Sequence, residues 1–277
     1  MSKLIRSLEI SSNASESRIG FETQGGGQWP AWDRYLTLDG RRAHHIGNIC
    51  DTCTFFFERM EGANDKLTLA FADELRQGLK ELNPDFVERA VSILPAGAYI
   101  AALLELQPHL VVPGSKDDYF AHEQIESWGV DSFWGLAHNP KNEYYRTERQ
   151  GIGAHAALFE FVVPMFPSRW LNPQTLETYR NAAKHKSCPT ALAISILDIK
   201  QHYDSDQQHW CWAHYLLDGH HKMKAASEQN ATLSLLSFTA VEKGVSTKEQ
   251  LSELFVAQRK SLTTAPPPPR SLLYPSA

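Results

Sequence analysis

The segment YLLDGHHKMK, residues 215–224, decides the fold of this chain. Its apolar start predicts a β-strand, the Asp-Gly dipeptide predicts a tight turn, and a helix is expected to begin directly afterwards. The first amide groups of a helix have no partner within the helix, and the helix dipole favours negative charge beside them. The segment therefore predicts an anion site, with phosphate as the first candidate ligand.

The residues of this turn suit a phosphate ligand for different reasons. Gly219 lets the backbone approach a ligand closely, and Lys222 supplies a compact positive charge. His220 and His221 can donate hydrogen bonds, and the Asp218 carboxylate is suited to a magnesium ion that also binds phosphate and water. A structural alternative stays open, in which Asp-Gly is a simple turn and Lys222 lies on a solvated helix face.

The elements around the turn follow a regular order. We expect strands over residues 158–165, 190–199, 209–217 and 232–238, a helix that begins at Asn172-Pro173, and a second helix that ends near residue 230. This gives the order β-α-β-β-α-β. Together with Asp-Gly-His-His-Lys at the start of the second helix, the order resembles the ParB/sulfiredoxin-like superfamily over about a third of the chain.

Members of that superfamily include chromosome-partitioning CTPases, sulfiredoxins and free-serine kinases, in which a Gly-x-x-Arg or Gly-x-His-Arg motif contacts nucleotide phosphates. The resemblance implies a nucleotide (ATP, ADP or CTP) with magnesium, bound by Gly219, His220, His221 and Lys222. It also implies phosphoryl transfer or nucleotide hydrolysis, with Asp218, His220 and His221 as catalytic residues. Lys222 stands where arginine is usual, and a lysine is a point charge rather than a bidentate fork.

Two residues outside the turn are further candidates for the site, one for catalysis and one for phosphate binding. In kinase members of the superfamily a glutamate near the first strand serves as base, and Glu160 at this place would take the proton from an attacking hydroxyl. The alternative is that Glu160 is a solvent-facing residue beside Phe159 and Phe161. Arg169, in a polar loop, can reach a phosphate and is otherwise an ordinary surface residue.

A second group of candidate site residues, this time for a metal ion, lies before residue 54. Cys50 and Cys53 are spaced as half of a tetrahedral zinc site, and His45 upstream can add a nitrogen ligand. No second C-x-x-C exists, so another cysteine or a distant histidine would have to close the site. The pattern predicts a structural zinc knuckle, with free thiols or a redox pair as alternatives. The bulky apolar residues 55–57 disfavour a thioredoxin-like helix.

Composition limits the class of protein. The formal net charge is −5 and the lysines and arginines are scattered, which disfavours broad attachment to nucleic acid. No apolar run approaches the roughly 18 residues of a membrane helix, and the N-terminus lacks the apolar stretch of a signal peptide. Four cysteines are too few for a disulfide framework in 277 residues. We therefore expect a cytoplasmic protein.

The predicted fold class is α+β. We expect a flexible arm or an edge strand over residues 1–30, and an N-terminal α+β domain over 31–153 with the knuckle and a β-hairpin at Asp39-Gly40. The same domain is expected to hold a helix over 66–82, a helix capped by Asn83, and a helix that ends at Gly129. A ParB/sulfiredoxin-like domain follows over 154–262, with a last helix capped by Ser246 and Glu249, and a proline-rich tail over 263–277.

Three functions fit these features. The first is a nucleotide-binding protein that transfers or hydrolyses a phosphoryl group at the turn. The second is a non-catalytic nucleotide-sensing or protein-interaction module, with a partner protein or a homodimer. The third, nuclease-type processing of nucleic acid, is disfavoured by the acidic charge.

Overall fold

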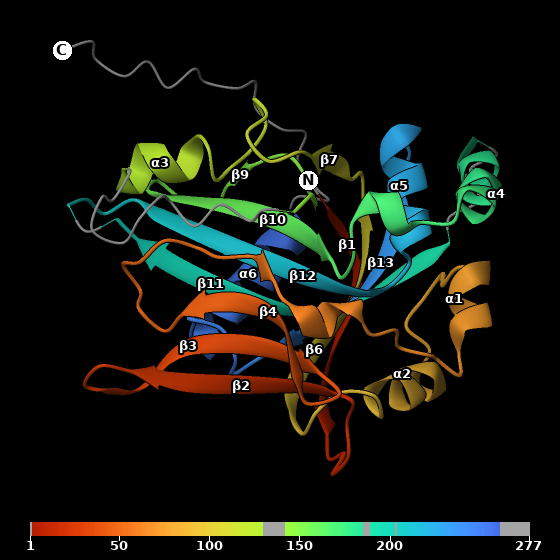
Figure 1. Cartoon of the computed structure of the whole chain (residues 1–277), viewed down its shortest axis with the longest axis horizontal. Coiled ribbons are helices and arrows are strands. Elements are labelled where there is room, and N and C mark those ends of the chain that lie inside the picture. Colours follow the sequence, from red (N-terminus) through yellow and green to blue (C-terminus); the bar gives the residue numbers. More distant parts are fainter. Residues whose placement is uncertain (1, 130–141, 185–188, 203, 261–277) are drawn as a thin grey trace.

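The computed structural model describes residues 2–129, 142–184, 189–202 and 204–260 (Figure 1). Over these residues the chain forms a mixed α+β fold with a nine-stranded and a four-stranded sheet, sheets A and B. The spatial order of sheet A is β1 (Lys3–Ser12), β6 (Gly97–Leu106), β13 (Leu233–Ala240), β11 (Thr190–Gln201), β12 (Gln208–Asp218), β10 (Ala156–Pro164), β8 (Tyr144–Arg146) and β7 (His109–Val111), and β9 (Gln150–Gly151) pairs with β10. Sheet B consists of β2 (Ile19–Gly26), β3 (Trp29–Leu38), β4 (Arg41–Asn48) and β5 (Glu58–Arg59).

The centre of sheet A has the predicted β-α-β-β-α-β order. Strands β10 and β12 are parallel, β11 and β12 are antiparallel, and β11 and β13 are parallel. Helix α4 (Pro173–Lys184) connects β10 to β11, and helix α5 (His220–Glu228) connects β12 to β13. Strand β11 is buried along nearly its whole length, as expected for a strand covered on both faces. The prediction of a mixed α+β fold is confirmed, and the ParB-like assignment stays a prediction.

The N-terminal residues belong to the sheets. Strand β1 pairs with β6 at one end of sheet A, and β2 is the outer strand of sheet B. The edge-strand alternative therefore describes this segment, rather than a flexible arm. Sheet A takes β6, β7 and β8 from before residue 154 and β10 to β13 from after it, so the predicted domain boundary falls within one sheet.

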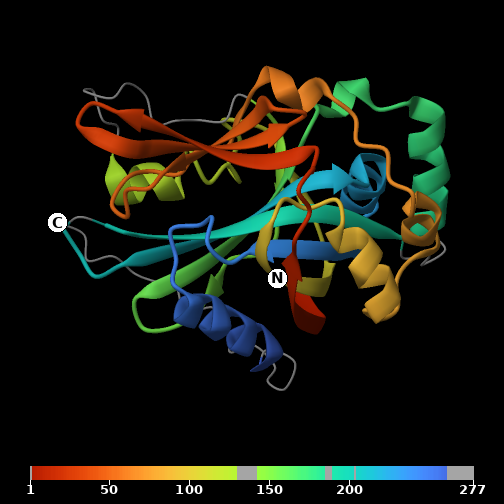
Figure 2. The same ribbon diagram turned by 90° about the horizontal axis from the view of Figure 1, so that it is seen from below.

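The two faces of sheet A are covered differently. Sheet B lies over one face, and helix α6 (Lys248–Lys260) lies against the other (Figure 2). The aromatic core between the sheets includes Phe57, Phe161 and Tyr215, whereas the core beneath α6 includes Trp212 and Phe255. No helix among the described residues is both long and apolar enough to cross a membrane.

Local sequence signals set several boundaries. The predicted hairpin is confirmed, because β3 and β4 meet at Asp39 and Gly40, whose φ angles are 52° and 72°. Helix α2 (Pro84–Val91) begins as predicted, with the Asn83 side chain accepting a hydrogen bond from the Asp85 amide. Helix α3 (Glu123–Trp128) ends at Gly129.

Two predicted helix boundaries are wrong. The helix expected over 66–82 is only α1 (Ala72–Gln77), because Gly78 follows with a φ of 90°. The capping box of α6 is formed by Thr247 and Gln250, one residue later than predicted, and each side chain accepts a hydrogen bond from the other residue's amide. The short 3₁₀ helices η1 (Glu61–Asn64) and η2 (Ser168–Trp170) complete the described elements. The proline-rich tail lies outside the described residues.

A buried ion pair joins sheet B to sheet A. The Arg34 guanidinium on β3 donates to both carboxylate oxygens of Asp198 on β11, at 3.0 and 2.6 Å. Both side chains are almost fully buried, with 6% and 4% of their surface exposed. Arg34 also donates to the carbonyl oxygens of Lys243 and Asn48, and the Val245 amide donates to Asp198. The pair is therefore hydrogen-bonded on several sides, as a buried ion pair must be to offset desolvation.

We expect Asp198→Asn to lower the free energy of unfolding by about 3–5 kcal/mol, because it leaves the buried Arg34 charge without its partner. Urea denaturation measures this loss. The matched control is Asp39→Asn, which breaks the exposed pair of Arg18 and Asp39 and is expected to lose at most about 1 kcal/mol. Equal losses in the two variants would contradict the role assigned to the buried pair.

Candidate functional site

A cavity of about 250 Å³ lies at the start of α5, and we call it the α5 cavity. Its walls are formed by Leu38 and residues 65–67 on the side of sheet B, by Met165 and Phe166 after β10, by Thr175 and Tyr179 on α4, and by residues 217–222. Because β10 and β12 are parallel, their carboxyl ends meet at this edge of sheet A. Ligands of open α/β sheets commonly bind outside the carboxyl ends of such strands.

The turn into α5 requires glycine at position 219. Gly219 has φ 100° and ψ 20°, in the left-handed region. A Cβ atom there would lie 2.7 Å from the Cβ of Ala191 on the neighbouring strand. Helix α5 has no side-chain cap at this end. Gly219 thus allows the helix to begin directly at the sheet edge, and no side chain of the cap residue covers its first amides.

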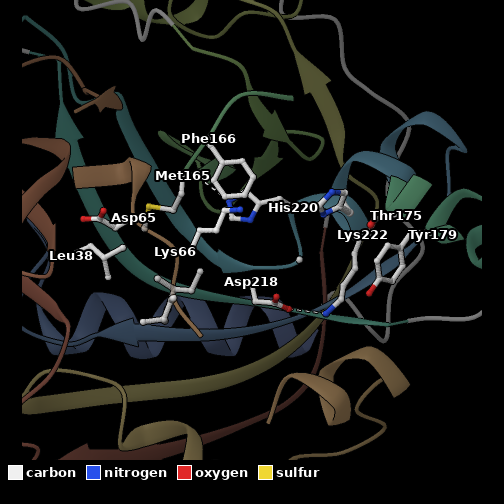
Figure 3. A pocket seen from close by; sticks show the side chains of 14 residues that line it. Leu38, Asp65, Lys66, Met165, Phe166, Thr175, Tyr179, Asp218, His220 and Lys222 are labelled. Carbon is white, nitrogen blue, oxygen red and sulfur yellow. Dashed lines mark hydrogen bonds and ion pairs between the residues drawn. The ribbon is translucent and has the colours of Figure 1, made fainter. Parts of the chain in front are cut away.

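Lys222 is turned inward and is only 5% exposed. Its ammonium donates to the Asp218 carboxylate at 2.7 Å (Figure 3). It also donates to the Thr190 carbonyl oxygen at 2.8 Å. Burial lowers the pKa of Lys222, and the neighbouring Asp218 charge opposes this effect. The interpretation of Lys222 as a solvated surface residue is therefore wrong. Its charge is largely balanced by Asp218.

Magnesium at Asp218 does not fit this arrangement. The Asp218 carboxylate is engaged by the Lys222 ammonium. Within the described part of the chain, no three His, Cys, Asp or Glu side chains are grouped so that they could hold a metal ion. The prediction of a magnesium cofactor at this turn is wrong for that reason.

The two histidines of the turn connect α5 to neighbouring segments. The Met165 amide donates to Nε2 of His220 at 3.0 Å, and the Asn172 amide donates to Nε2 of His221 at 2.9 Å. A neutral histidine that accepts at Nε2 carries its proton on Nδ1. Burial lowers the pKa of His220 to about 3, with smaller contributions from His221 and His44, and burial also lowers the pKa of His221. Both rings are therefore neutral near pH 7, and their Nδ1–H groups remain as donors.

Among the described residues that line the cavity, Lys66 is an exposed cation that the sequence analysis did not identify. Lys66 lines the wall opposite the turn, and its charge contributes to the lowered pKa of His221. The acid beside it, Asp65, is bound by Arg41. No ion pair of Lys66 is found among the described residues. Its only sequence signal is a lone lysine in a loop, and its role depends on the docking of sheet B.

A second hollow, of about 440 Å³, shares two wall residues with the α5 cavity. Thr175 and Tyr179, one helical turn apart on α4, line both hollows. Arg76 on α1 lines the second hollow, and its charge contributes to the lowered pKa of Lys222. Thr175 and Tyr179 thus give both hollows polar groups from α4, and the α5 cavity also has apolar lining residues.

Glu160 lies away from the α5 cavity. On β10 its carboxylate accepts from the Ser2 amide at 3.2 Å and from the Thr147 hydroxyl at 2.8 Å, and its other oxygen is 3.4 Å from Nε2 of His214. Burial raises the pKa of Glu160, but His214 and the two hydrogen bonds outweigh burial and lower it overall. Glu160 is only 3% exposed, so it is neither the predicted solvent-facing residue nor a base at the turn. Arg169 is exposed in η2 and does not line the cavity.

The same buried cluster resembles a hydrolase triad in composition but not in access. The Ser195 hydroxyl is 2.7 Å from Nδ1 of His214, and the Glu160 carboxylate lies on the other side of that ring. The Ser195 hydroxyl is also 2.8 Å from the hydroxyl of Ser237. Ser195 and His214 have no exposed surface. A nucleophile must reach its substrate, so we interpret the cluster as a polar network that links β10, β11, β12 and β13.

The predicted zinc knuckle is wrong. Cys50 and Cys53 form a disulfide, so neither sulfur is available as a thiolate ligand. The His45 ring is stacked between Tyr35 and Phe56, with ring centroids 4.8 Å from each, and its Nε2 is 3.0 Å from the Asp33 carboxylate. Sequence spacing alone does not distinguish a disulfide from half of a zinc site.

Comparisons with protein-family models, with curated proteins and with solved structures found no match to this chain. Its function is therefore inferred from the geometry of the α5 cavity.

We expect Gly219→Ala to lower the free energy of unfolding by about 2–4 kcal/mol, because backbone strain and overpacking against Ala191 add. The matched control is Gly114→Ala. Gly114 also has a positive φ, of 79°, but its missing Cβ faces open space, so only strain of about 1 kcal/mol is expected. Chemical denaturation measures both losses, and an equal loss in the two variants would exclude close packing at the turn.

Acid should destabilise the fold through His220. In the unfolded state the His220 imidazole takes up a proton near pH 6.5, whereas in the native state it stays neutral down to about pH 3. Stability is therefore fully present above pH 6.5 and decreases as the pH falls, by about 1 kcal/mol between pH 6 and pH 5 for this residue. His220→Gln should remove that part of the decrease, while His122→Gln, at an exposed position, serves as control. An unchanged pH dependence in His220→Gln, measured by urea denaturation, would refute the buried neutral ring.

Proposed function

We propose that this chain binds a small phosphorylated ligand, with a nucleotide as the first candidate, and that the phosphate lies at the start of α5. The observation that carries the proposal is the uncapped helix start at Gly219, beside which His220 and His221 retain Nδ1–H donors. Helix amides and neutral histidines bind an anion without a metal ion. Lys66 adds an exposed positive charge on the facing wall.

The apolar part of the wall suits the organic part of such a ligand. Leu38, Leu67, Phe166 and Leu217 face the same cavity as the turn. Its volume of about 250 Å³ is slightly below the roughly 300–1,000 Å³ of drug-sized ligand sites. A phosphate with its attached sugar or a similar small ring fits this volume better than a whole nucleoside triphosphate. A larger ligand would extend toward the second hollow along α4.

We limit the proposal to binding, because the predicted catalytic residues either lie outside the cavity or are engaged in other contacts. Glu160 is enclosed in the core, Asp218 is paired with Lys222, and the Nε2 atoms of both histidines accept backbone amides. General base catalysis needs a basic atom within hydrogen-bonding reach of the substrate. The arrangement therefore favours the nucleotide-sensing alternative over phosphoryl transfer.

A thermal-shift screen in the presence of EDTA tests the proposal. The ligands are AMP, ADP, ATP, CTP, ribose 5-phosphate, inorganic phosphate and adenosine. A ligand that binds only the native state raises the melting temperature. We expect the phosphorylated compounds to do so and adenosine to fail, since the turn binds the phosphate.

Charge substitution locates the binding site. We expect Lys66→Ala to weaken binding of the best phosphorylated ligand about tenfold, as for loss of one hydrogen bond to a charged group. Lys248→Ala, which removes an exposed lysine at the start of α6, is the matched control and should bind normally. Isothermal titration calorimetry measures both affinities. Equal affinity of the Lys66 and Lys248 variants, or failure of every phosphorylated compound to bind, would contradict the proposal.

A further inference from the structure

The Cys50–Cys53 disulfide lies in a surface loop at the far end of β11 from the α5 cavity. Both cysteines are half-buried, and Asp51 and Thr52 between them are exposed. A disulfide that closes so short a loop stabilises the fold by only about 2 kcal/mol, because it removes little entropy from the unfolded chain. Stabilisation of the fold is therefore a weak reason for this bond.

The loop is held in place by contacts that do not involve sulfur. The Lys200 ammonium donates to the carbonyl oxygens of Cys50 and Thr54 at 3.0 and 3.2 Å. The Gln201 amide donates to the Asp51 carbonyl oxygen at 2.8 Å, and the Trp128 indole donates to that of Thr52 at 2.8 Å. None of these bonds involves a sulfur atom, so reduction of the disulfide leaves all their donors and acceptors in place. The two thiols would then stay close enough to form the disulfide again.

Two groups near Cys50 can stabilise a thiolate: the Lys200 ammonium, which binds the Cys50 carbonyl oxygen, and the Thr52 hydroxyl beside the Cys50 sulfur. Lys200 has no exposed surface, so its charge is poorly screened by water. The charged and titratable groups near this ammonium are Asp198, Arg34, Cys211 and Asp51; Asp198 is paired with Arg34. Burial lowers the pKa of Lys200 to about 8, which leaves it mostly protonated at pH 7. The Thr52 hydroxyl is 3.3 Å from the Cys50 sulfur and can donate to a thiolate there.

We propose that Cys50 and Cys53 are an exchangeable disulfide that accepts electrons from a small dithiol and that can pass them to a substrate disulfide. A thiolate of the dithiol attacks the Cys53 sulfur, the Cys50–Cys53 bond breaks, and Cys50 leaves as the thiolate. The second thiol of the reductant loses its proton to water and attacks the mixed disulfide. Cys53 then leaves and is protonated, so that the reductant is oxidised to a cyclic disulfide and the protein is reduced by two electrons.

Variants that keep one cysteine of the pair test which sulfur is activated. Cys53→Ser leaves the Cys50 thiol and Cys50→Ser leaves the Cys53 thiol; both are made in a Cys188→Ser background, and Cys211 is buried. At pH 7 we expect iodoacetamide to alkylate the Cys50 thiol at least about tenfold faster than the Cys53 thiol, because more of it is thiolate. In the Cys53→Ser background, Thr52→Val and Lys200→Met should each slow this reaction. The Thr52 change keeps the test valid if Lys200→Met fails to fold. Equal rates at Cys50 and Cys53 would overturn the assignment.

Exchange itself is tested on the full chain with dithiothreitol. We expect the native protein to reach a reversible equilibrium between disulfide and dithiol when the ratio of reduced to oxidised dithiothreitol is varied, as counted by mass after alkylation. Circular dichroism should show the same fold in both forms, because the loop contacts remain. A disulfide that dithiothreitol does not reduce in the native protein, and reduces only in denaturant, would overturn the proposal. Neither result depends on ligand binding in the α5 cavity.

Discussion

The docking of sheet B on sheet A is the constraint on which the rest of the structure depends, and the buried Arg34–Asp198 pair bridges the two sheets beside their shared core. Strand β3 carries both Arg34 and Leu38, and Leu38 forms one wall of the α5 cavity. The opposite wall begins at Leu217 on sheet A. A cavity made from two sheets exists only while they are held together, so a buried charge pair supports a site that it does not touch.

The α5 turn shows how a polar motif can be used mainly for structure while still leaving donors for a ligand. Lys222 and Asp218 balance each other's charge, and the Nε2 atoms of His220 and His221 bind neighbouring backbone. What remains are neutral donors: helix amides and Nδ1–H groups. Neutral donors at a helix start recognise an anion but do not abstract a proton, which is why we infer a binding function.

Features with local causes could be predicted from the sequence, and features that depend on distant residues could not. The turn at Gly40, the cap at Asn83 and the order of strands and helices along the chain around α5 follow from neighbouring residues. The pairing of β1 with β6, the burial of Lys222 and the position of Lys66 depend on segments far apart in the chain. The C-x-x-C spacing was ambiguous because a disulfide and half of a zinc site share it.

The most direct measurement of the central claim is a backbone amide NMR titration of the ¹⁵N-labelled chain with AMP in the presence of EDTA. We predict that the amide signals of His220, His221 and Lys222 move most and saturate together, since the phosphate would lie against the first turn of α5. Saturable shifts that spare these three amides, or no saturable shift, would contradict it.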